Sequence, residues 1–305
     1  MPSIAIVGSG AVGSYYGGRL AVANEDVRFL VRSGLEELRD KGLTVESVAG
    51  DFVVERPQVF DSTSAIGPVD LVIVAWKATA NDHCQDVISP LLHEDTAILT
   101  LQNGLGNTER LAELFGEQRV LGGLCFVCIN RVRAGLIHHL ARGLVTIGEF
   151  FGGVSARLRD LEERFTAAGI ECRAVEDLAA AQWAKLVWNV PFNGLCIAEG
   201  GITTRELLSQ ERGEREVRAL MQEVIAAASA LGKEIPAEMI DQQVAATIEM
   251  GAYRPSSMID YLERRDVELE AIWEEPLRRA QAVGAKLPHW EHLQERIRMR
   301  LAERH

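Results

Sequence analysis

The chain has 305 residues, of which 47% are hydrophobic and 25% charged, and its formal net charge is −12 at pH 7. This composition is typical of a globular protein long enough for two domains that each bury a core. The acidic balance argues against a nucleic-acid partner or an anionic membrane surface, and no apolar run reaches the length of a membrane span. Because the first apolar strand begins almost at once, we expect no signal peptide and predict a cytoplasmic protein.

The N-terminal segment IAIVGSGAVGS combines a short apolar run with Gly8, Gly10 and Gly13. The run is typical of a strand buried on both faces, and the AVGSYYGGRLA that follows is typical of a helix. In this context the G-x-G-x-x-G pattern predicts a dinucleotide site rather than a turn that binds nothing. The turn would be tight at Gly8, open to a pyrophosphate at Gly10 and closely packed at Gly13. The predicted cofactor contacts in this segment are Gly8, Ser9, Gly10, Ala11, Val12 and Gly13.

Short apolar runs alternate with helical patterns through the first half, which indicates a parallel sheet with crossover helices. The predicted strands are SIAIVG, DVRFLVR, DLVIVAW, AILTLQN and RVLGGLCFVCIN. The alternating segment LTVESVAGDFVVE contains a Gly-Asp turn and predicts a hairpin, and GLIHHLARGLVTIGE predicts another. A helix over VSARLRDLEERFTAAG and a short strand over IECRAV would complete this domain.

The end of the second predicted strand indicates which cofactor is bound. In NAD sites an acidic residue about 20 positions past the glycines binds the ribose 2′-hydroxyl, whereas here DVRFLVRSG ends in Arg32 and Ser33. Arginine and serine would bind the 2′-phosphate that a carboxylate would repel. We therefore predict NADP as the cofactor, with Arg32 among its contacts; the alternative is that Arg32 merely ends a strand in solvent.

Two further polar residues follow predicted parallel strands. Lys77 follows the third strand in VAWKATAND, and Asn103 follows the fourth in TLQNGLGN. Ligands of open α/β sheets bind at the carboxyl ends of the strands, so both side chains are candidate site residues rather than solvated loop residues.

The cysteines are an odd, scattered set, which favours reduced thiols over a disulfide framework. Cys125 and Cys128 have C-x-x-C spacing, but they lie in the apolar run GGLCFVCI, and with His138 and His139 they match no familiar zinc template. We interpret them as buried strand cysteines and predict no metal site.

From about Asp177 onward nearly every segment has helical periodicity. The sequence therefore predicts an α/β protein with an N-terminal Rossmann-like, doubly wound parallel sheet and a second, all-helical domain. We place the NADP-binding domain at residues 1–175 and the helical substrate or catalytic domain at residues 176–305. The substrate would meet the cofactor in a cleft between them.

The segment WAKLVWNVPFNGL places three polar residues on one face of a helix. Lys185, Asn189 and Asn193 recur at i, i+4 and i+8, whereas the other face is apolar. Asparagine is a poor helix former, so two asparagines are not expected on a helix face that is only exposed to solvent. A substrate-facing role of Asn189 and Asn193 is therefore favoured. In RPSSMIDYLERRDVELEAIW, Ser256 or Ser257 suits a helix start, and Glu268 is expected within the helix.

Together, GSGAVGS, WKA at 76–78, QNGLG at 102–106, KLVWNVPFN and PSSM…D…E resemble the ketopantoate reductase family over the whole length of the chain. The resemblance implies NADPH-dependent reduction of a 2-oxo acid, 2-dehydropantoate in the first instance. The alternatives are another branched 2-oxo acid or a non-catalytic NADPH-binding sensor. Second domains of this kind often pair, so a homodimer is compatible with the sequence.

The resemblance also implies roles for individual residues. Lys185 resembles the catalytic lysine, and Glu268 resembles the glutamate that orients substrate and cofactor. Four residues resemble substrate-binding positions: Asn189, Asn193, Asn103 and Ser257 (or Ser256). Lys77 and Asn103 also resemble a pair that lies close to the cofactor and the substrate. The usual H-x-G-P-G reads HHLARG at 138–143, and the stretch between PSSM and Glu268 is one residue shorter than in the best-known members.

Overall fold

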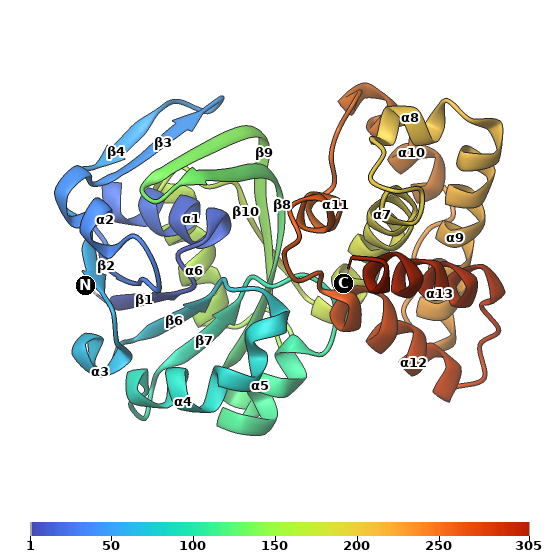
Figure 1. Ribbon diagram of the computed structural model, residues 1–305. Helices are drawn as coiled ribbons and strands as arrows, with labels where there is room; N and C mark the ends of the chain where they lie inside the picture. The colour runs from blue at the N-terminus through green and yellow to red at the C-terminus, as the bar shows by residue number, and fades with distance from the viewer. Residues whose placement is uncertain (1, 305) are drawn as a thin grey trace. The chain divides into compact units, whose positions relative to one another are not determined.

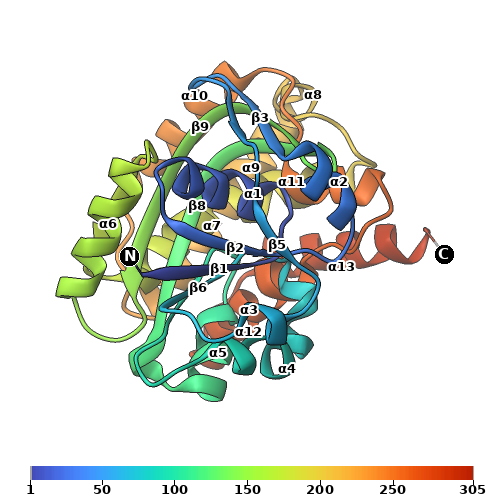
Figure 2. The ribbon, with the colours of Figure 1, turned by 90° about the vertical axis from the view of Figure 1, so that its left-hand side faces the viewer.

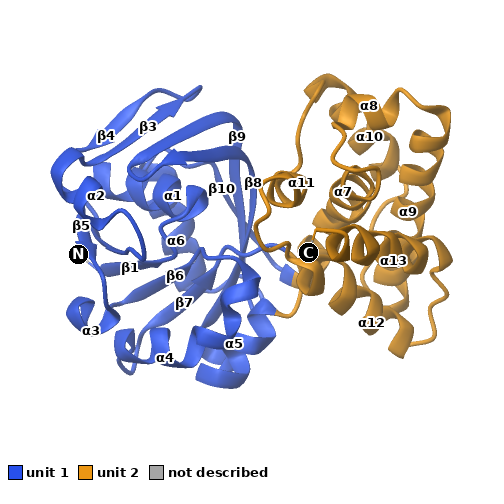
Figure 3. Ribbon diagram, in the orientation of Figure 1, with its two compact units in different colours: residues 1–103, 107–178 blue, residues 104–106, 179–305 orange. Residues whose placement is uncertain are grey.

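The structure is a computed structural model that describes residues 2–304, and it divides into two compact units (Figure 3). Unit 1 comprises residues 1–103 and 107–178, and unit 2 comprises residues 104–106 and 179–305. Leu105 belongs to unit 2 because its backbone N–H donates to the carbonyl oxygen of Ala271 at 2.8 Å. The assignment of cofactor and substrate roles to residues 1–175 and 176–305 stays a prediction. None of the helices within residues 2–304 has the length and apolar character needed to cross a membrane.

Unit 1 is built on one ten-stranded sheet with the order β4-β3-β9-β8-β7-β6-β1-β2-β5, in which β10 pairs with β9. The β3–β4 and β8–β9 pairs are antiparallel, and the other pairs are parallel. Because β2 and β6 flank β1 on opposite sides, the strand order reverses at β1, where doubly wound folds bind their ligands. The strands are β1 (Ser3–Val7), β2 (Asp26–Leu30), β3 (Leu43–Ser47), β4 (Phe52–Val54), β5 (Gln58–Phe60), β6 (Leu71–Val74), β7 (Ala97–Thr100), β8 (Val120–Arg133), β9 (Leu136–Glu149) and β10 (Cys172–Val175).

Helices cover both faces of this sheet (Figures 1 and 2). Ile4 and Ile6 of β1 join the apolar cluster beneath α1, α2 and α6, whereas Ala5 and Val7 join the cluster beneath α3, α4 and α5. Side chains alternate along a strand, so a strand that is apolar at every position must be buried on both faces. The helical segments are α1 (Ala11–Val22), α2 (Leu35–Lys41), α3 (Thr63–Ile66), α4 (Cys84–Ile88), α5 (Asn107–Phe115), α6 (Ala156–Ala167) and the 3₁₀ turns η1 (Ala78–His83), η2 (Ser89–Leu91) and η3 (Glu117–Arg119).

The structure confirms the predicted fold class, the five predicted strands and the β3–β4 hairpin. The prediction of a separate hairpin over GLIHHLARGLVTIGE is wrong, because this segment is the single strand β9, which pairs with β8 along its length. The turn-like residues Arg142 (φ +63°) and Gly143 (φ +142°) are absorbed within the strand at irregularities of the β8–β9 register. The sequence reading also missed the three-residue strand β5.

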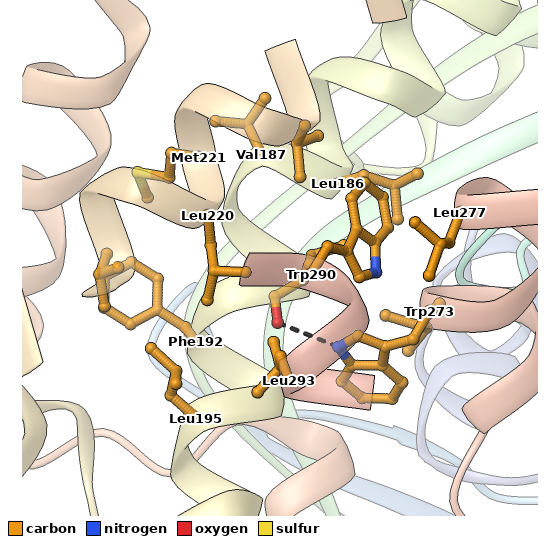
Figure 4. Close-up of a cluster of buried hydrophobic side chains, with 14 of the residues drawn as sticks. Leu186, Val187, Phe192, Leu195, Leu220, Met221, Trp273, Leu277, Trp290 and Leu293 are labelled. Atoms are coloured by element: carbon orange, nitrogen blue, oxygen red, sulfur yellow. Dashed lines mark hydrogen bonds between the residues drawn. The ribbon is translucent and has the colours of Figure 1, made fainter. Parts of the chain in front are cut away.

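Unit 2 is helical and has its own apolar core (Figure 4). The longest helix, α7, continues through Pro191 and contributes Leu186, Val187 and Phe192 to this core. Near Pro191, the indole Nε1 of Trp273 donates a hydrogen bond to the carbonyl oxygen of Val190 at 3.0 Å. The helical segments are α7 (Leu178–Ala198), α8 (Thr204–Leu208), α9 (Glu211–Ala230), α10 (Met239–Met250), α11 (Ser256–Leu262), the π-helical turn η4 (Glu270–Glu274), α12 (Glu275–Ala282) and α13 (Pro288–Ala302).

Two buried tryptophans of this core differ in one hydrogen bond. Trp273 and Trp290 are both fully buried, but the Nε1 of Trp290 has no hydrogen-bond partner among residues 2–304. Replacing either with Phe removes similar apolar volume, whereas only W273F removes a satisfied hydrogen bond. We expect W273F to lower the free energy of unfolding by about 1–3 kcal/mol more than W290F, since an unpaired buried donor is itself costly. Urea denaturation measures both, and equal losses would contradict this account.

Candidate active site

The turn between β1 and α1 has the geometry of a phosphate cradle. Gly8 has a φ of +105°, and a Cβ there would overlap the backbone of Trp76. A Cβ on Gly13 would overlap the carbonyl oxygen of Gly8, so this glycine is required by the close approach of α1 to β1. At Gly10, by contrast, a Cβ would meet no heavy atom within 4 Å. The backbone at Gly10 therefore faces open space into which a pyrophosphate would fit.

The start of α1 favours an anion at the same place. Gly10 is the N-cap of α1 and supplies no side-chain hydrogen bond, and the first turn contains no acidic residue. The first N–H groups of a helix lack partners within the helix, and the helix dipole makes this end positive. The predicted contacts Ala11 and Val12 form this first turn, so the turn fits the phosphates of a dinucleotide.

A side-chain hydrogen bond ties this turn to the end of β2. The Oγ of Ser9 donates to the carbonyl oxygen of Leu30, the last residue of β2, at 2.7 Å. Arg32 lies two residues further along the chain, is exposed, and makes no hydrogen bond or ion pair with any residue in the described range 2–304. The structure thus brings the glycine turn and Arg32 together, with the guanidinium available to a ligand.

A chain of hydrogen-bonded amides joins the loops that follow β6 and β7. The Oδ1 of Asn81 accepts hydrogen bonds from Trp76 Nε1 at 3.3 Å and from Gln102 Nε2 at 2.7 Å. Its Nδ2 donates to Asn107 Oδ1 at 2.8 Å, and Asn107 Nδ2 donates to the carbonyl oxygen of Asn103 at 2.9 Å. Because this network joins both loops, Asn81 is a positioning residue that sequence reasoning missed.

Lys77 and Asn103 are the candidate site residues in these loops. Both are half-buried, Lys77 just before the turn η1 and Asn103 after β7. Each therefore lies at the carboxyl end of a parallel strand, as the sequence predicts. The amide network accounts for the position of Asn103, since its carbonyl oxygen is one of the network's acceptors.

Helix α7 carries Lys185, Asn189 and Asn193 at successive four-residue steps, which places them on one face. Lys185 is half-buried, whereas the asparagines are 8% and 2% exposed. The side-chain amide of Asn189 forms no hydrogen bond within the described part of the chain. A buried polar group without a partner is costly, so this amide is suited to a ligand that supplies the missing bond.

Asn193 also fixes the start of α11. Its Oδ1 accepts a hydrogen bond from the backbone N–H of Ser257 at 2.9 Å. Ser257 is 1% exposed, whereas its neighbour Ser256 is exposed. The structure therefore brings Asn193 and Ser257 together within unit 2 and leaves the hydroxyl of Ser256 accessible.

The expectation that Glu268 lies within a helix is wrong. Helix α11 ends at Leu262, and Arg264 has a φ of +54°, which no α-helix continues through. The backbone N–H of Arg265 donates to the carbonyl oxygen of Asp260 at 2.8 Å, which closes the helix end. Glu268 lies in the irregular segment that follows, 7% exposed, and its carbonyl oxygen accepts the N–H of Ile272 at 3.2 Å. Glu268 therefore lies next to a π-helical turn, a feature often found at functional sites.

None of the five cysteines forms a disulfide within the described residues, and burial makes Cys84, Cys172 and Cys196 poor nucleophiles. Burial raises the pKa of Cys84 to about 11 and that of Cys172 and Cys196 to about 12. In the described range 2–304, no group of three or more His, Cys, Asp or Glu side chains is arranged to hold a metal ion.

A phosphate cradle at the switch point of a doubly wound sheet, together with a helical unit that carries a lysine, buried amides and a carboxyl group, defines an NADP-binding oxidoreductase of the Rossmann type. Residues 4–152 match the family model "Ketopantoate reductase PanE/ApbA", and residues 177–301 match "Ketopantoate reductase PanE/ApbA C terminal". The chain belongs to the ketopantoate reductase family.

Individual relatives agree with the family assignment. A 2-dehydropantoate 2-reductase of Nostoc sp. is 40% identical over 289 residues, which cover 93% of this chain and 90% of the relative. The crystal structure of 2-dehydropantoate 2-reductase from Geobacter metallireducens has a TM-score of 0.95 and 42% identity, and the match covers 97% of this chain and 99% of that one. D-mandelate dehydrogenase with NADH and anilino(oxo)acetate has a TM-score of 0.90 at 20% identity, with 99% and 98% of the two chains covered. At that identity it shares the fold alone.

Gly10 and Gly13 distinguish cofactor binding from folding. We expect G13A to lower the free energy of unfolding by about 1–3 kcal/mol, because its methyl group would overlap the Gly8 carbonyl oxygen. We expect G10A to change that free energy by less than about 0.5 kcal/mol, because the site is open, and to weaken NADPH binding about tenfold or more. Urea denaturation and fluorescence titration with NADPH measure the two effects. Wild-type affinity in G10A would show that no phosphate lies against this backbone.

Proposed function

We propose that this protein reduces 2-dehydropantoate to pantoate in pantothenate biosynthesis, with NADPH as the reductant. The observation that carries the proposal is the face of α7 with Lys185, Asn189 and Asn193, in a chain that matches the family across both units. When bound, NADPH supplies a hydride for the C2 carbonyl carbon of the substrate.

Lys185 is the proposed catalytic residue. As hydride arrives at C2, negative charge develops on the carbonyl oxygen, and the ammonium group of Lys185 would stabilise that charge. The same group would then donate the proton that completes the hydroxyl group. The reaction needs one proton and one hydride, so a single positioned cation suffices.

Neutral amides suit the neutral hydroxyl of the substrate. Asn189 has an unbonded amide at 8% exposure, and Asn193 keeps its Nδ2 available because its Oδ1 holds Ser257. Ser257, or its accessible neighbour Ser256, would hold the substrate carboxylate. Glu268 would accept a hydrogen bond from the substrate hydroxyl and from the nicotinamide ribose.

Residues of unit 1 would hold the cofactor. The open backbone at Gly10 and the first turn of α1 would bind the pyrophosphate, and Arg32 the 2′-phosphate. Lys77 and Asn103, at the ends of parallel strands, would contact cofactor and substrate near the reacting atoms.

The cysteines and the net charge bear on the cellular location and the partners of the protein. We propose a cytoplasmic location, because cysteines that form no disulfide within residues 2–304 suit a reducing compartment. The net charge of −12 disfavours nucleic acid as a partner. We also propose a homodimer, since helical second domains of this kind often pair.

Replacing Lys185 tests the mechanism. K185A removes the proton donor and the charge that stabilises the developing alkoxide, so kcat should fall about 10²–10⁴-fold, while NADPH binding is retained. The matched control is K286A, an exposed lysine of unit 2, which should leave kcat unchanged. NADPH oxidation followed at 340 nm measures both, and near-normal kcat in K185A would rule out this role.

A panel of 2-oxo acids tests the substrate. Purified protein should oxidise NADPH with 2-dehydropantoate at a kcat/KM at least tenfold above that with other branched 2-oxo acids. Turnover on another acid alone would keep the mechanism and replace the substrate. NADPH binding without turnover on any acid would favour a sensor instead.

A further inference from the structure

The turn of the β8–β9 hairpin reaches the loop that carries Arg32. The Nη2 of Arg131 donates a hydrogen bond to the carbonyl oxygen of Ser33 at 3.3 Å. In the same loop, a Cβ on Gly34 would overlap the side chain of Ala134 at the hairpin turn. The guanidinium of Arg131 therefore lies beside the Ser33–Gly34 peptide group, one residue beyond Arg32, although the two arginines are far apart in the sequence.

The sheet holds the hairpin in this position. Strand β3 pairs in parallel with β9 from Thr44 opposite Leu136, and the N–H of Thr44 donates to the carbonyl oxygen of Gly135 at 2.8 Å. A Cβ on Gly135 would lie 2.7 Å from the carbonyl oxygen of Gly42, so the turn packs directly on the segment after α2. Arg131 thus lies in a paired strand, β8, rather than in a loop.

The charges around the loop favour an anion. Both Arg131 and Arg32 are exposed, and neither forms an ion pair with any residue from 2 to 304. The hydrogen bond to Ser33 uses one of the five N–H donors of a guanidinium, which leaves most of them for a ligand. Nearby on α2, Glu36 is paired with Arg39, so Glu37 is the one carboxylate of the first turn without a cation partner among residues 2–304. Two guanidinium groups against one carboxylate leave a positive site.

We propose that Arg131 is a second specificity residue for the cofactor, which binds the 2′-phosphate of NADPH together with Arg32. This inference rests on the NADP-dependent function proposed above and adds a residue from a distant part of the chain. A guanidinium binds phosphate oxygens through paired, charge-assisted hydrogen bonds, and two of them can enclose a phosphate dianion from two sides. The hydrogen bond to the Ser33 carbonyl oxygen holds the Arg131 side chain beside the loop that carries Arg32.

The test measures binding of two adenosine nucleotides, independently of enzyme activity. Calorimetry with adenosine 2′,5′-bisphosphate reports the 2′-phosphate contact, and calorimetry with AMP reports everything else. We expect R131Q to weaken bisphosphate binding about tenfold or more and AMP binding less than twofold. R131K should recover part of the loss, because it keeps the charge without the guanidinium geometry. The control R159Q removes an exposed arginine of α6, and both of its affinities should stay within twofold of wild type.

The outcomes separate this inference from the proposed function. Equal weakening of both nucleotides in R131Q would show that Arg131 supports the loop rather than the phosphate, and would overturn the inference. Equal effects of R131Q and R159Q would assign the loss to net charge and overturn it as well. If R131Q keeps the wild-type preference for the bisphosphate, only this inference fails. If the wild type itself has no such preference, the NADP assignment fails.

Discussion

A side chain cannot be placed at Gly13, because its Cβ would occupy the position of the Gly8 carbonyl oxygen. This steric constraint sets how closely α1 approaches β1. One turn further along α1, a Cβ on Gly17 would lie 2.7 Å from the ring of Phe29, so the helix also packs directly on β2. The close packing leaves the backbone at Gly10 open, and the bond from Ser9 to Leu30 fixes β2 to the same turn. The position of the cradle and that of the end of β2, with Arg32 two residues beyond it, thus both depend on this close packing.

In unit 2, the two asparagines on the polar face of α7 are buried rather than displayed on a solvated surface, and Lys185 on the same face is half-buried. Asn193 supports a neighbouring helix through its Oδ1, and Asn189 is buried with its amide unbonded. Trp273 adds a hydrogen bond to the α7 backbone beside Pro191. A rigid helix with buried amides is suited to precise positioning, because its side chains have few alternative conformations.

Local patterns in the sequence were sufficient for much of the fold. The strands, the β3–β4 hairpin, the glycine turn and the amphipathic face of α7 all depend on residues close together in the chain. The sequence predicts a hairpin where the structure has the single strand β9. Arg142 and Gly143 do have the positive φ angles typical of a turn, but they lie within the strand at irregularities of its pairing with β8. The sequence places Glu268 within a helix because the helical periodicity continues past Leu262. In the structure α11 ends there, and Arg264 has a left-handed backbone conformation.

The long-range contacts of the site could not be predicted in this way. Asn81 joins two loops through side chains, and Arg131 reaches Ser33 across 98 positions of sequence. These contacts depend on single side chains far apart in the sequence, which local patterns do not specify.

Residues 104–106 prevent the two units from being separated by a single cut in the chain. Leu105 is 3% exposed and belongs to the apolar core of unit 2, although the chain on both sides of it belongs to unit 1. The polypeptide therefore passes between the units at 103/104, at 106/107 and at 178/179. If the chain were divided after residue 178, the N-terminal fragment would expose Leu105. The C-terminal fragment would lack that side chain from its apolar core. Exchange of the helical unit between relatives would thus require replacing two separate segments, residues 104–106 as well as residues 179–305.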